Sequence, residues 1–370
     1  MNDGVTGGRP PLAVGVGPLA LQTVGGTPAE TGEQVAVMVE SARVAEAAGL
    51  DSVVVSEHHF AEDGYLPSPL LALAALARET STLRLATGVA LGGLYDPLRL
   101  AEDAALLDHL SGGRFELGLG LGYRDLELRA FGTTRKARVE RIERCVEVLR
   151  AAWAGTAVTG TGLLAPDEGV APRPLPATAG GPPLLLGAFV AEGVRRAGRL
   201  GDGWIAPVLS SPAQLGRRLD LLRDVRAFAR PFRVVVSLSG FVAATDAWAT
   251  CRQGVARVEA QYRRWLQESG DLPGLDGRPF DEGRDDGRPP GFVVGTPAEC
   301  VAALRPWLVP LAGLPVTVSP ELVLRVHYPG LDPEVQVEAV RLLGEEVAPV
   351  LRGAWKDLSS ASRQGGGQLD

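Results

Sequence analysis

The feature that most constrains the fold is a rhythm of short apolar runs, each followed by a segment of helical periodicity, between residues 51 and 132. The runs Ser52–Ser56, Leu83–Leu91 and Arg114–Leu119 each end at a cluster of small or ionisable residues. Buried strands that alternate with helices are typical of a parallel sheet. We therefore expect the reactive side chains of this chain to gather at one edge of such a sheet.

The rhythm begins with a strand at Leu12–Val16 and continues, less cleanly, to a last helix at Pro333–Leu351. Later strands are expected at 183–188, 203–207, 232–243 and 324–327. About eight strand–helix units result, which is the number that closes a barrel. The predicted fold class is therefore α/β, a TIM (β/α)8 barrel. The alternative, an open doubly wound sheet, usually has a glycine-rich turn and a helix directly after its first strand, and no helix follows at once here.

Two segments interrupt the rhythm. Residues 156–182 are rich in Gly, Pro and Thr and are interpreted as an excursion from the barrel. Residues 268–293 have neither helical nor strand periodicity, and we favour a lid over a disordered insertion there. The barrel is assigned to residues 11–353 as one catalytic domain, with disordered tails at 1–10 and 359–370.

Composition excludes several classes of function. The formal net charge is −7 and no run of Lys or Arg forms a basic stripe, which argues against a nucleic-acid partner. No apolar run reaches the length of a membrane span, so no membrane partner is expected. The three cysteines are far apart in the chain, which fits a reducing compartment, and the short apolar stretch near the N-terminus is a poor signal peptide. We expect a cytoplasmic protein.

Two of the four histidines, His58 and His59, are adjacent at the predicted end of the second strand. An imidazole at that position could act as a general base near neutral pH. The other ring would be held by a carboxylate, with Glu57, Asp96 and Glu102 as candidates. The alternative is a hydrogen-bonded structural pair. No metal is expected, because adjacent side chains diverge along an extended backbone and no cysteine cluster supports a site.

Small residues mark two further strand ends. Thr87–Val89, centred on Gly88, is compatible with close approach of a ligand or with a tight layer of the barrel. Gly118–Tyr123 reads G-L-G-L-G-Y, whose spacing differs from the dinucleotide fingerprint. Missing side chains there would leave a flat slot that admits an aromatic ring.

The strand and turn before Ala191 are a candidate phosphate site. Free N–H groups at the start of a helix bind phosphate without charged side chains, although a plain turn between strand and helix explains the pattern as well. His109 lies within an apolar helical stretch and is interpreted as structural. His327, at the expected end of the last strand, is a candidate to line the site.

Together these pieces resemble the luciferase-like monooxygenase family, which includes bacterial luciferase and many flavin- or deazaflavin-dependent oxidoreductases. The matching pieces, in chain order, are S-E-H-H-F at 56–60, A-T-G-V at 86–89, D-P-L-R-L-A-E-D at 96–103, L-D-H-L-S-G-G-R-F-E-L-G-L-G-L-G-Y at 107–123, A-F-G at 130–132, G-D-G-W at 201–204 and V-G-T-P-A-E-C at 294–300.

The resemblance implies a TIM barrel with a flavin in the cleft at its rim. It implies that His58 is the catalytic histidine and that His59 belongs to a buried polar network near a subunit interface. It places a non-proline cis peptide at Gly88–Val89, beneath the flavin ring. The predicted cofactor-binding residues are Glu57, Thr87, Gly88, Val89, Gly120, Tyr123, Glu127, Ala188, Phe189, Val190 and Gly193. Residues expected behind them or toward the substrate are His59, Asp96 and His327.

The chain departs from luciferases at the phosphate end. Luciferases have an arginine where this chain has Leu121 and a reactive cysteine where it has Gly120, and their hydroxyl phosphate ligands fall at Val190 and Gly193. Phosphate would then be held by backbone N–H groups and by Arg124 or Arg195. Reduced FMN remains the favoured cofactor, with coenzyme F420 as the alternative.

The resemblance therefore implies a flavin-dependent monooxygenase that uses O2, a small organic substrate and reduced FMN from a separate NAD(P)H:flavin reductase. The alternatives are an F420-dependent dehydrogenase or reductase on the same barrel, and a flavin-binding protein without catalysis. Family members commonly dimerise through helices that correspond to 68–79 and 97–110, so a homodimer is expected. No pattern in the loops identifies the substrate.

Overall fold

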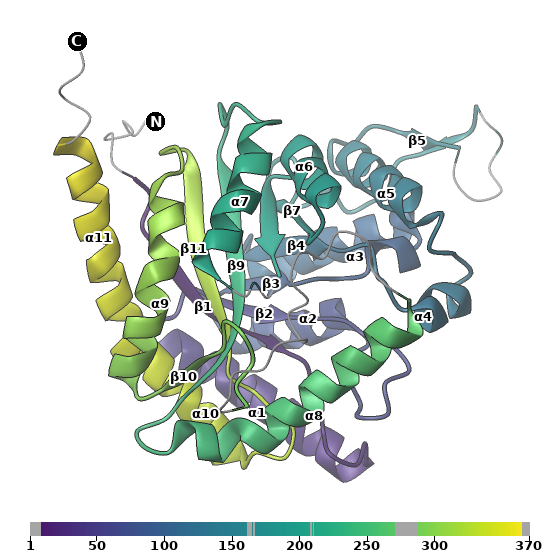
Figure 1. The fold of residues 1–370 in the computed structure, drawn as a ribbon. Helices are drawn as coiled ribbons and strands as arrows, with labels where there is room; N and C mark the ends of the chain where they lie inside the picture. The colour runs from purple at the N-terminus through teal and green to yellow at the C-terminus, as the bar shows by residue number, and fades with distance from the viewer. Residues whose placement is uncertain are drawn as a thin grey trace.

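The computed structural model describes residues 9–364, except 161–164, 166, 208, 210 and 271–286. In this part of the chain, parallel strands follow one another in the order β9-β11-β1-β2-β3-β4-β7-β8. Strand β8 also pairs with β9, so the eight strands close into a barrel that helices surround (Figure 1). The prediction of a TIM barrel is confirmed, and the closure excludes the open sheet.

The barrel strands are β1 Ala13–Leu19, β2 Ser52–Val55, β3 Arg84–Thr87, β4 Phe115–Leu119, β7 Leu184–Gly187, β8 Gly203–Ala206, β9 Phe232–Val242 and β11 Val318–Arg325. The helices are α1 Pro28–Ala47, α2 Pro69–Glu79, α3 Pro97–Ser111, α4 Asp125–Ala130, α5 Arg138–Trp153, α6 Ala191–Leu200, α7 Pro212–Arg223, α8 Ala247–Glu268, α9 Pro297–Ala312, α10 Pro333–Leu342 and α11 Ala348–Gln364. A short 3-10 turn at Gly92–Leu94 precedes α3, and a π turn at Leu343–Val347 joins α10 to α11.

Several helices begin at N-cap residues that can be recognised in the sequence. Thr27 caps α1 and forms a reciprocal capping box with Glu30, and a second capping box starts α9. Proline occupies the first turn in both cases, where its missing N–H has no intrahelical acceptor. Asp96 caps α3 by accepting hydrogen bonds from the backbone N–H groups of Leu98 and Arg99. These caps fix where each helix leaves the rim of the barrel.

The barrel interior is layered, because alternate residues of every strand point inward. The middle layer is apolar and consists of Val54, Ala86, Leu185, Ile205, Val235 and Val323. Two residues earlier on the strands lies an ionic layer in which Arg84 and Arg233 pair with Glu116 and Glu321. Gly15 leaves space for this layer, since a Cβ on it would lie 2.0 Å from Ser52 Oγ. The N-terminal end of the barrel is therefore filled, and the opposite end remains for a ligand.

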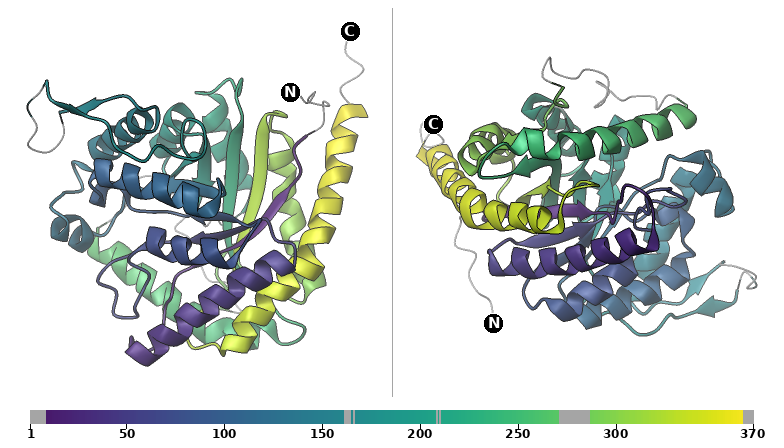
Figure 2. Two further views of the ribbon diagram at one scale, coloured as in Figure 1. Left: turned by 180° about the vertical axis from the view of Figure 1, so that it is seen from behind. Right: turned by 90° about the horizontal axis from the view of Figure 1, so that it is seen from below.

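Helix α8 crosses the carboxyl end of the barrel (Figures 1 and 2). The excursion at 156–182 carries a small antiparallel pair, β5 Val158–Thr159 and β6 Gly169–Val170, which projects from the barrel. Most of the predicted lid falls on 271–286, outside the described residues. None of the helices in the described part of the chain is long and apolar enough to cross a membrane.

The C-terminal third differs from the sequence-based expectations. Strand β10, Val293–Gly295, and helix α9 have no counterpart in them, and β11 begins at Val318 rather than at Leu324. Two prolines lie inside α9, and in the sequence they interrupt the periodicity expected of a helix. The charged Glu321 interrupts the apolar run of β11, because its side chain points into the barrel and pairs with Arg84. Helix α11 continues to Gln364, beyond the start of the expected disordered tail at 359.

Candidate active site

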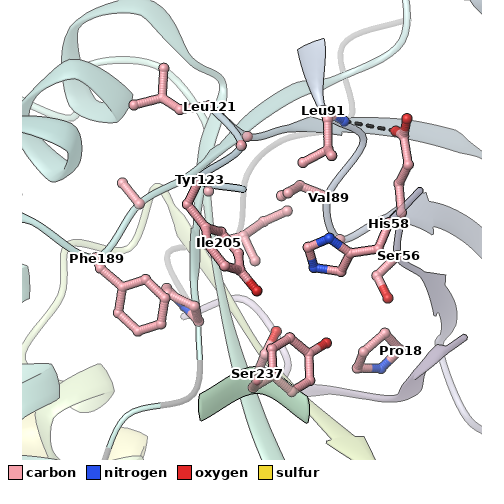
Figure 3. A pocket seen from close by; sticks show the side chains of 18 of the residues that line it. Pro18, Ser56, His58, Val89, Leu91, Leu121, Tyr123, Phe189, Ile205 and Ser237 are labelled. Atoms are coloured by element: carbon pink, nitrogen blue, oxygen red, sulfur yellow. Dashed lines mark hydrogen bonds between the residues drawn. The ribbon is translucent and has the colours of Figure 1, made fainter. Parts of the chain in front are cut away.

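A cavity of about 530 Å³ opens at the carboxyl end of the barrel. Its floor is the layer directly above the apolar one, two residues further along each strand: Ser56, Gly88, Gly187, Pro207, Ser237 and Arg325. Helix α8 contributes a wall through Val255, Val258 and Tyr262. Figure 3 shows His58, Val89 and Tyr123 directed into the same space from different loops.

The floor is flat because glycines stand where side chains would fill it. The Gly88–Val89 peptide is cis, which confirms the prediction for this bond. A Cβ on Gly120 would lie 2.4 Å from Val89 Cγ2, and one on Gly187 would lie 2.6 Å from Val89 Cγ1. Both distances are far below van der Waals contact, so these glycines are what allows Val89 to pack across the strand ends.

His58 is held by Glu127, which comes from helix α4. The Nδ1 atom of His58 lies 2.9 Å from Glu127 Oε1, and both side chains are buried. The same oxygen accepts hydrogen bonds from the backbone N–H of His59 and from Arg124 Nη1, each at 2.9 Å. Burial alone would raise the pKa of Glu127, but the hydrogen bonds from His58 and His59 and the charge of Arg124 together hold this pKa below its ordinary value.

The ionised state of Glu127 determines the tautomer of His58. A carboxylate can only accept hydrogen bonds, so the proton between the two groups resides on Nδ1. The neutral imidazole then carries its lone pair on Nε2, which makes no hydrogen bond to a described residue. Because His58 lines the cavity, this lone pair is available to a ligand there.

Glu57 organises the neighbouring loops. Its Oε1 atom lies 2.7 Å from His59 Nε2, so of the three carboxylates proposed as the partner of the second histidine, Glu57 is the one in contact. Its Oε2 atom accepts hydrogen bonds from the backbone N–H of Leu91, drawn as a dashed line in Figure 3, and from the Tyr95 hydroxyl. His59 thus belongs to a largely buried polar network behind the cavity.

Aromatic side chains surround the His58 ring. Tyr65, Tyr123 and Tyr262 present their rings at steep angles to it, and the Trp265 ring centroid lies 4.7 Å from that of His58. A chain of hydroxyl groups runs from Ser56 to Tyr65 at 2.6 Å and on to Tyr262 at 2.8 Å. The sequence analysis missed Tyr262 and Trp265, although their spacing of three residues places both on one side of α8.

The opposite end of the cavity lies at the start of α6, beside Phe189, which is labelled in Figure 3. Val190 is the N-cap of α6 and supplies no side-chain hydrogen bond to the first turn, so N–H groups there remain available to an anion. Besides Arg325 on the floor, the arginines that line this cavity are Arg138 and Arg196. Burial, followed by the charge of a neighbouring arginine, lowers the pKa of Arg138.

The expectation that Arg124 or Arg195 serves this end of the cavity does not hold. Arg124 is committed to Glu127 and to the His59 carbonyl, and its guanidinium stacks over Trp265 at 4.1 Å. Arg195 faces Glu192 on the outer side of α6 and does not line the cavity. A residue one position further along a helix points about 100° away, and Arg196 lines the cavity where Arg195 does not. Arg196 Nε also donates to Glu143 Oε1 at 2.8 Å.

Most of the predicted cofactor-binding residues line the cavity, and a few do not. Those that do are Glu57, Gly88, Val89, Gly120, Tyr123, Ala188, Phe189, Val190 and Gly193, together with His58. Thr87 lies behind the floor, where its hydroxyl is hydrogen-bonded to the backbone of Gly118. Glu127 acts on the cavity through His58.

Two of the residues expected beside the substrate lie elsewhere. Asp96 caps α3 and does not line the cavity. His327 lies behind the cavity, with Nε2 3.1 Å from Ser41 Oγ, and burial together with the charge of Arg325 lowers the pKa of His327 to about 3. His109 bonds to the Leu175 carbonyl on the outside of the barrel, as expected of a structural residue. Among the described residues, no cluster of His, Cys, Asp and Glu side chains is arranged to hold a metal ion.

The family model described as luciferase-like monooxygenase matches residues 15–309. This chain belongs to the luciferase-like monooxygenase family. The match begins within β1 and ends within α9, so β11 lies beyond it.

Two curated relatives illustrate the range of similarity within the luciferase-like family. The uncharacterized protein y4vJ of Sinorhizobium fredii is 31% identical over 189 residues, which cover 50% of this chain and 52% of that protein. The alkanal monooxygenase alpha chain of Photorhabdus luminescens is 38% identical over 96 residues, covering 26% of this chain and 27% of the relative. The chain therefore spans about half the length, or less, of these two relatives.

Solved structures share the whole luciferase-like barrel. Monooxygenase RslO1 from Streptomyces bottropensis aligns with a TM-score of 0.71 at 24% identity, covering 92% of this chain and 99% of RslO1. The oxygenating constituent of 3,6-diketocamphane monooxygenase from Pseudomonas putida, solved with FMN, aligns at 0.68 and 19% identity, covering 92% and 98%. An F420-dependent secondary alcohol dehydrogenase aligns at 0.66 and 15% identity, covering 92% and 99%. At these identities the likeness is one of fold.

Proposed function

We propose that this chain is a flavin-dependent monooxygenase that uses reduced FMN and O2 to oxygenate a small organic substrate. The observation that carries the proposal is one continuous cavity that joins the His58–Glu127 pair, a flat floor of small residues and the start of α6. The alkanal monooxygenase relative supports an oxygenating reaction, and the neighbour solved with FMN has the same barrel.

The residues present fit a flat ring system with a phosphate tail. The cis Gly88–Val89 peptide and the glycines at 120 and 187 form a surface on which a planar ring can lie. Arg138 and Arg196, with the N–H groups of α6, provide positive charge for a phosphate at the far end of the same cavity. These arginines replace the phosphate ligands of luciferases that this chain lacks.

When bound, reduced FMN supplies the electrons that activate O2. The protein itself excludes water with the apolar walls of the cavity, and His58 accepts and returns a proton at Nε2. Glu127 keeps the proton of the neutral imidazole on Nδ1 and stabilises the imidazolium after Nε2 has accepted a second proton. The Tyr65 and Tyr262 hydroxyls add hydrogen-bonding groups beside the ring.

The test is an assay of the purified protein with reduced FMN, O2 and a panel of small organic substrates, with ¹⁸O2 as the source of label. Incorporation of one labelled atom, reduced at least tenfold in His58→Ala with an unchanged melting temperature, supports the proposal. Turnover with reduced or oxidised F420 without oxygen would assign hydride transfer instead. Stoichiometric FMN binding without turnover on any substrate would leave a flavin-binding protein.

We also propose two protein partners. A separate NAD(P)H:flavin reductase delivers reduced FMN, as the description of the P. putida neighbour as an oxygenating constituent suggests by analogy. A second copy of the chain packs against α2 and α3, whose outer faces expose Leu71, Leu106 and Leu110. Leucines exposed to this degree on adjacent helices are typical of a protein interface.

A further inference from the structure

Arg325 is the charged member of the layer that floors the cavity. It is the last residue of β11 and pairs in register with Ser239 of β9. Its side chain is 5% exposed and lines the cavity, whereas its neighbours in the layer are serine, glycine and proline. A guanidinium is thus buried at the centre of an otherwise small and neutral surface.

The hydrogen bonds of Arg325 do not neutralise its positive charge. Nε donates to the His327 carbonyl at 3.1 Å, and Nη2 donates to Gln22 Oε1 at 2.5 Å. Both acceptors are neutral. The guanidinium also lies over the Tyr328 ring, with Cζ 5.1 Å from the ring centroid. Three of its five N–H groups, two on Nη1 and one on Nη2, have no hydrogen-bond acceptor among the described residues. A forked pair of such donors is what a carboxylate accepts.

Gln22 is itself fixed so that only its oxygen can face Arg325. Its Nε2 atom donates to Asp63 Oδ2 at 2.7 Å and to Gln261 Oε1 at 2.6 Å. The carboxylate of Asp63 is therefore separated from the guanidinium by the whole glutamine side chain. In the described part of the chain no carboxylate lies within ion-pair distance of Arg325.

The other arginines inside the barrel, and Arg124 beside His58, pair directly with carboxylates. Arg84 and Arg233 lie in the ionic layer below the floor and pair with Glu116 and Glu321, and Arg124 pairs with Glu127 at 2.9 Å. A buried charge without a partner is costly, because burial removes the water that would otherwise solvate it. The contrast indicates that the partner of Arg325 comes from outside the chain, through the cavity.

The groups around Arg325 favour an anion. Ser237, Ser239 and Tyr262 bring hydroxyl groups to the same cavity. His327 lies behind the guanidinium and cannot supply a negative charge. Glu259, on the α8 wall, forms no ion pair with Arg325, and burial raises its pKa to about 7, against an opposing effect of Arg263. Glu57 is already engaged by His59, Leu91 and Tyr95.

We propose that Arg325 is a specificity residue that binds the carboxylate of an organic acid substrate on the floor of the cavity. The inference rests on the proposed function, and it names the class of substrate: a small organic carboxylate. The positive charge of Arg138 and Arg196 serves the phosphate at the other end, so the two anionic groups are bound by different arginines.

The test measures binding of matched carboxylate and carboxamide pairs by calorimetry: benzoate with benzamide, phenylacetate with phenylacetamide, and octanoate with octanamide. We expect at least one carboxylate to bind tenfold more tightly than its amide. Arg325→Met should abolish this preference, whereas Arg325→Lys, which keeps the charge, should retain part of it. A purely structural role would not produce a preference that follows the charge of residue 325.

Arg196→Met is the matched control, because it removes an arginine at the phosphate end and should leave the carboxylate preference intact. No preference in any pair, or an unchanged preference in Arg325→Met, overturns the proposal. Anaerobic titration with reduced FMN separates the two ideas. A tenfold loss of reduced-FMN binding in Arg325→Met with an intact carboxylate preference would place Arg325 at the flavin, and absence of flavin binding to the wild type would refute only the proposed function.

Discussion

The carboxylate of Glu127 lies 2.9 Å from the imidazole of His58, although the two residues are 69 positions apart in the sequence. The same Glu127 oxygen also accepts a hydrogen bond from the backbone of His59 and pairs with Arg124. Three hydrogen-bond donors therefore converge on a single oxygen atom. This convergence orients the His58 ring and leaves its Nε2 toward the cavity.

Glu127→Gln tests this pairing. The amide keeps the shape of the side chain but removes the charge that orders the proton on His58 Nδ1, so we expect turnover to fall at least tenfold. FMN affinity should change less than threefold, because Glu127 does not line the cavity. Steady-state kinetics and flavin titration provide the two measurements. Full activity in Glu127→Gln would remove the dyad from the mechanism.

Arg196→Met tests the phosphate end. We expect FMN to bind at least tenfold more weakly while riboflavin, which lacks the phosphate, binds as before, since a charge-assisted hydrogen bond to phosphate would be lost. Arg195→Met is the control, because Arg195 faces Glu192 outside the cavity. The comparison is made by fluorescence titration of both flavins. Equal weakening of FMN and riboflavin would indicate a structural effect of Arg196.

His327 gives the protein an acid-sensitive element. Its pKa is lowered to about 3 by burial and by Arg325, while that of an unfolded histidine is about 6.5. The unfolded chain then binds an extra proton below pH 6.5 and the folded chain does not, so stability from this group is lost as the pH falls from 6.5 toward 3.

The corresponding variant is His327→Gln, which keeps a polar group near Ser41 and does not titrate. Between pH 6.5 and pH 4 its free energy of unfolding should decrease less than that of the wild type, by roughly 3 kcal/mol if the full difference in pKa applies. Urea denaturation at several pH values measures this. Parallel pH profiles for the two proteins would contradict the prediction.

Leu106→Glu tests the proposed homodimer. Leu106 is 51% exposed on α3, and a buried charge at that point of an interface would oppose association. We expect light scattering after size exclusion to report a dimer for the wild type and a monomer for the variant. Val309→Glu, at a 62% exposed position on α9, is the matched control and should remain dimeric. A monomeric wild type would refute the dimer directly.

Local patterns in the sequence predict much of the fold. The alternation of apolar runs with helical segments predicted the barrel. The ends of the strands predicted at Ser52–Ser56 and Arg114–Leu119 correctly located the rim that carries the polar side chains. The cis bond at Gly88–Val89 followed from the resemblance, which rests on the same contiguous motifs. These features depend on burial and backbone shape within a few residues, so a linear pattern records them.

Tertiary structure alone decided which charged side chains meet. The rotation of α6 directs Arg196 rather than Arg195 into the cavity. The packing of α4 brought Glu127 to His58, whereas Glu57, one of the three predicted carboxylates, contacts His59. Closure of the barrel placed Glu321 and Arg325 of β11 in two different interior layers. The reason is physical: periodicity reports which face of an element is buried, whereas the partner across a barrel depends on register and closure of strands distant in the chain.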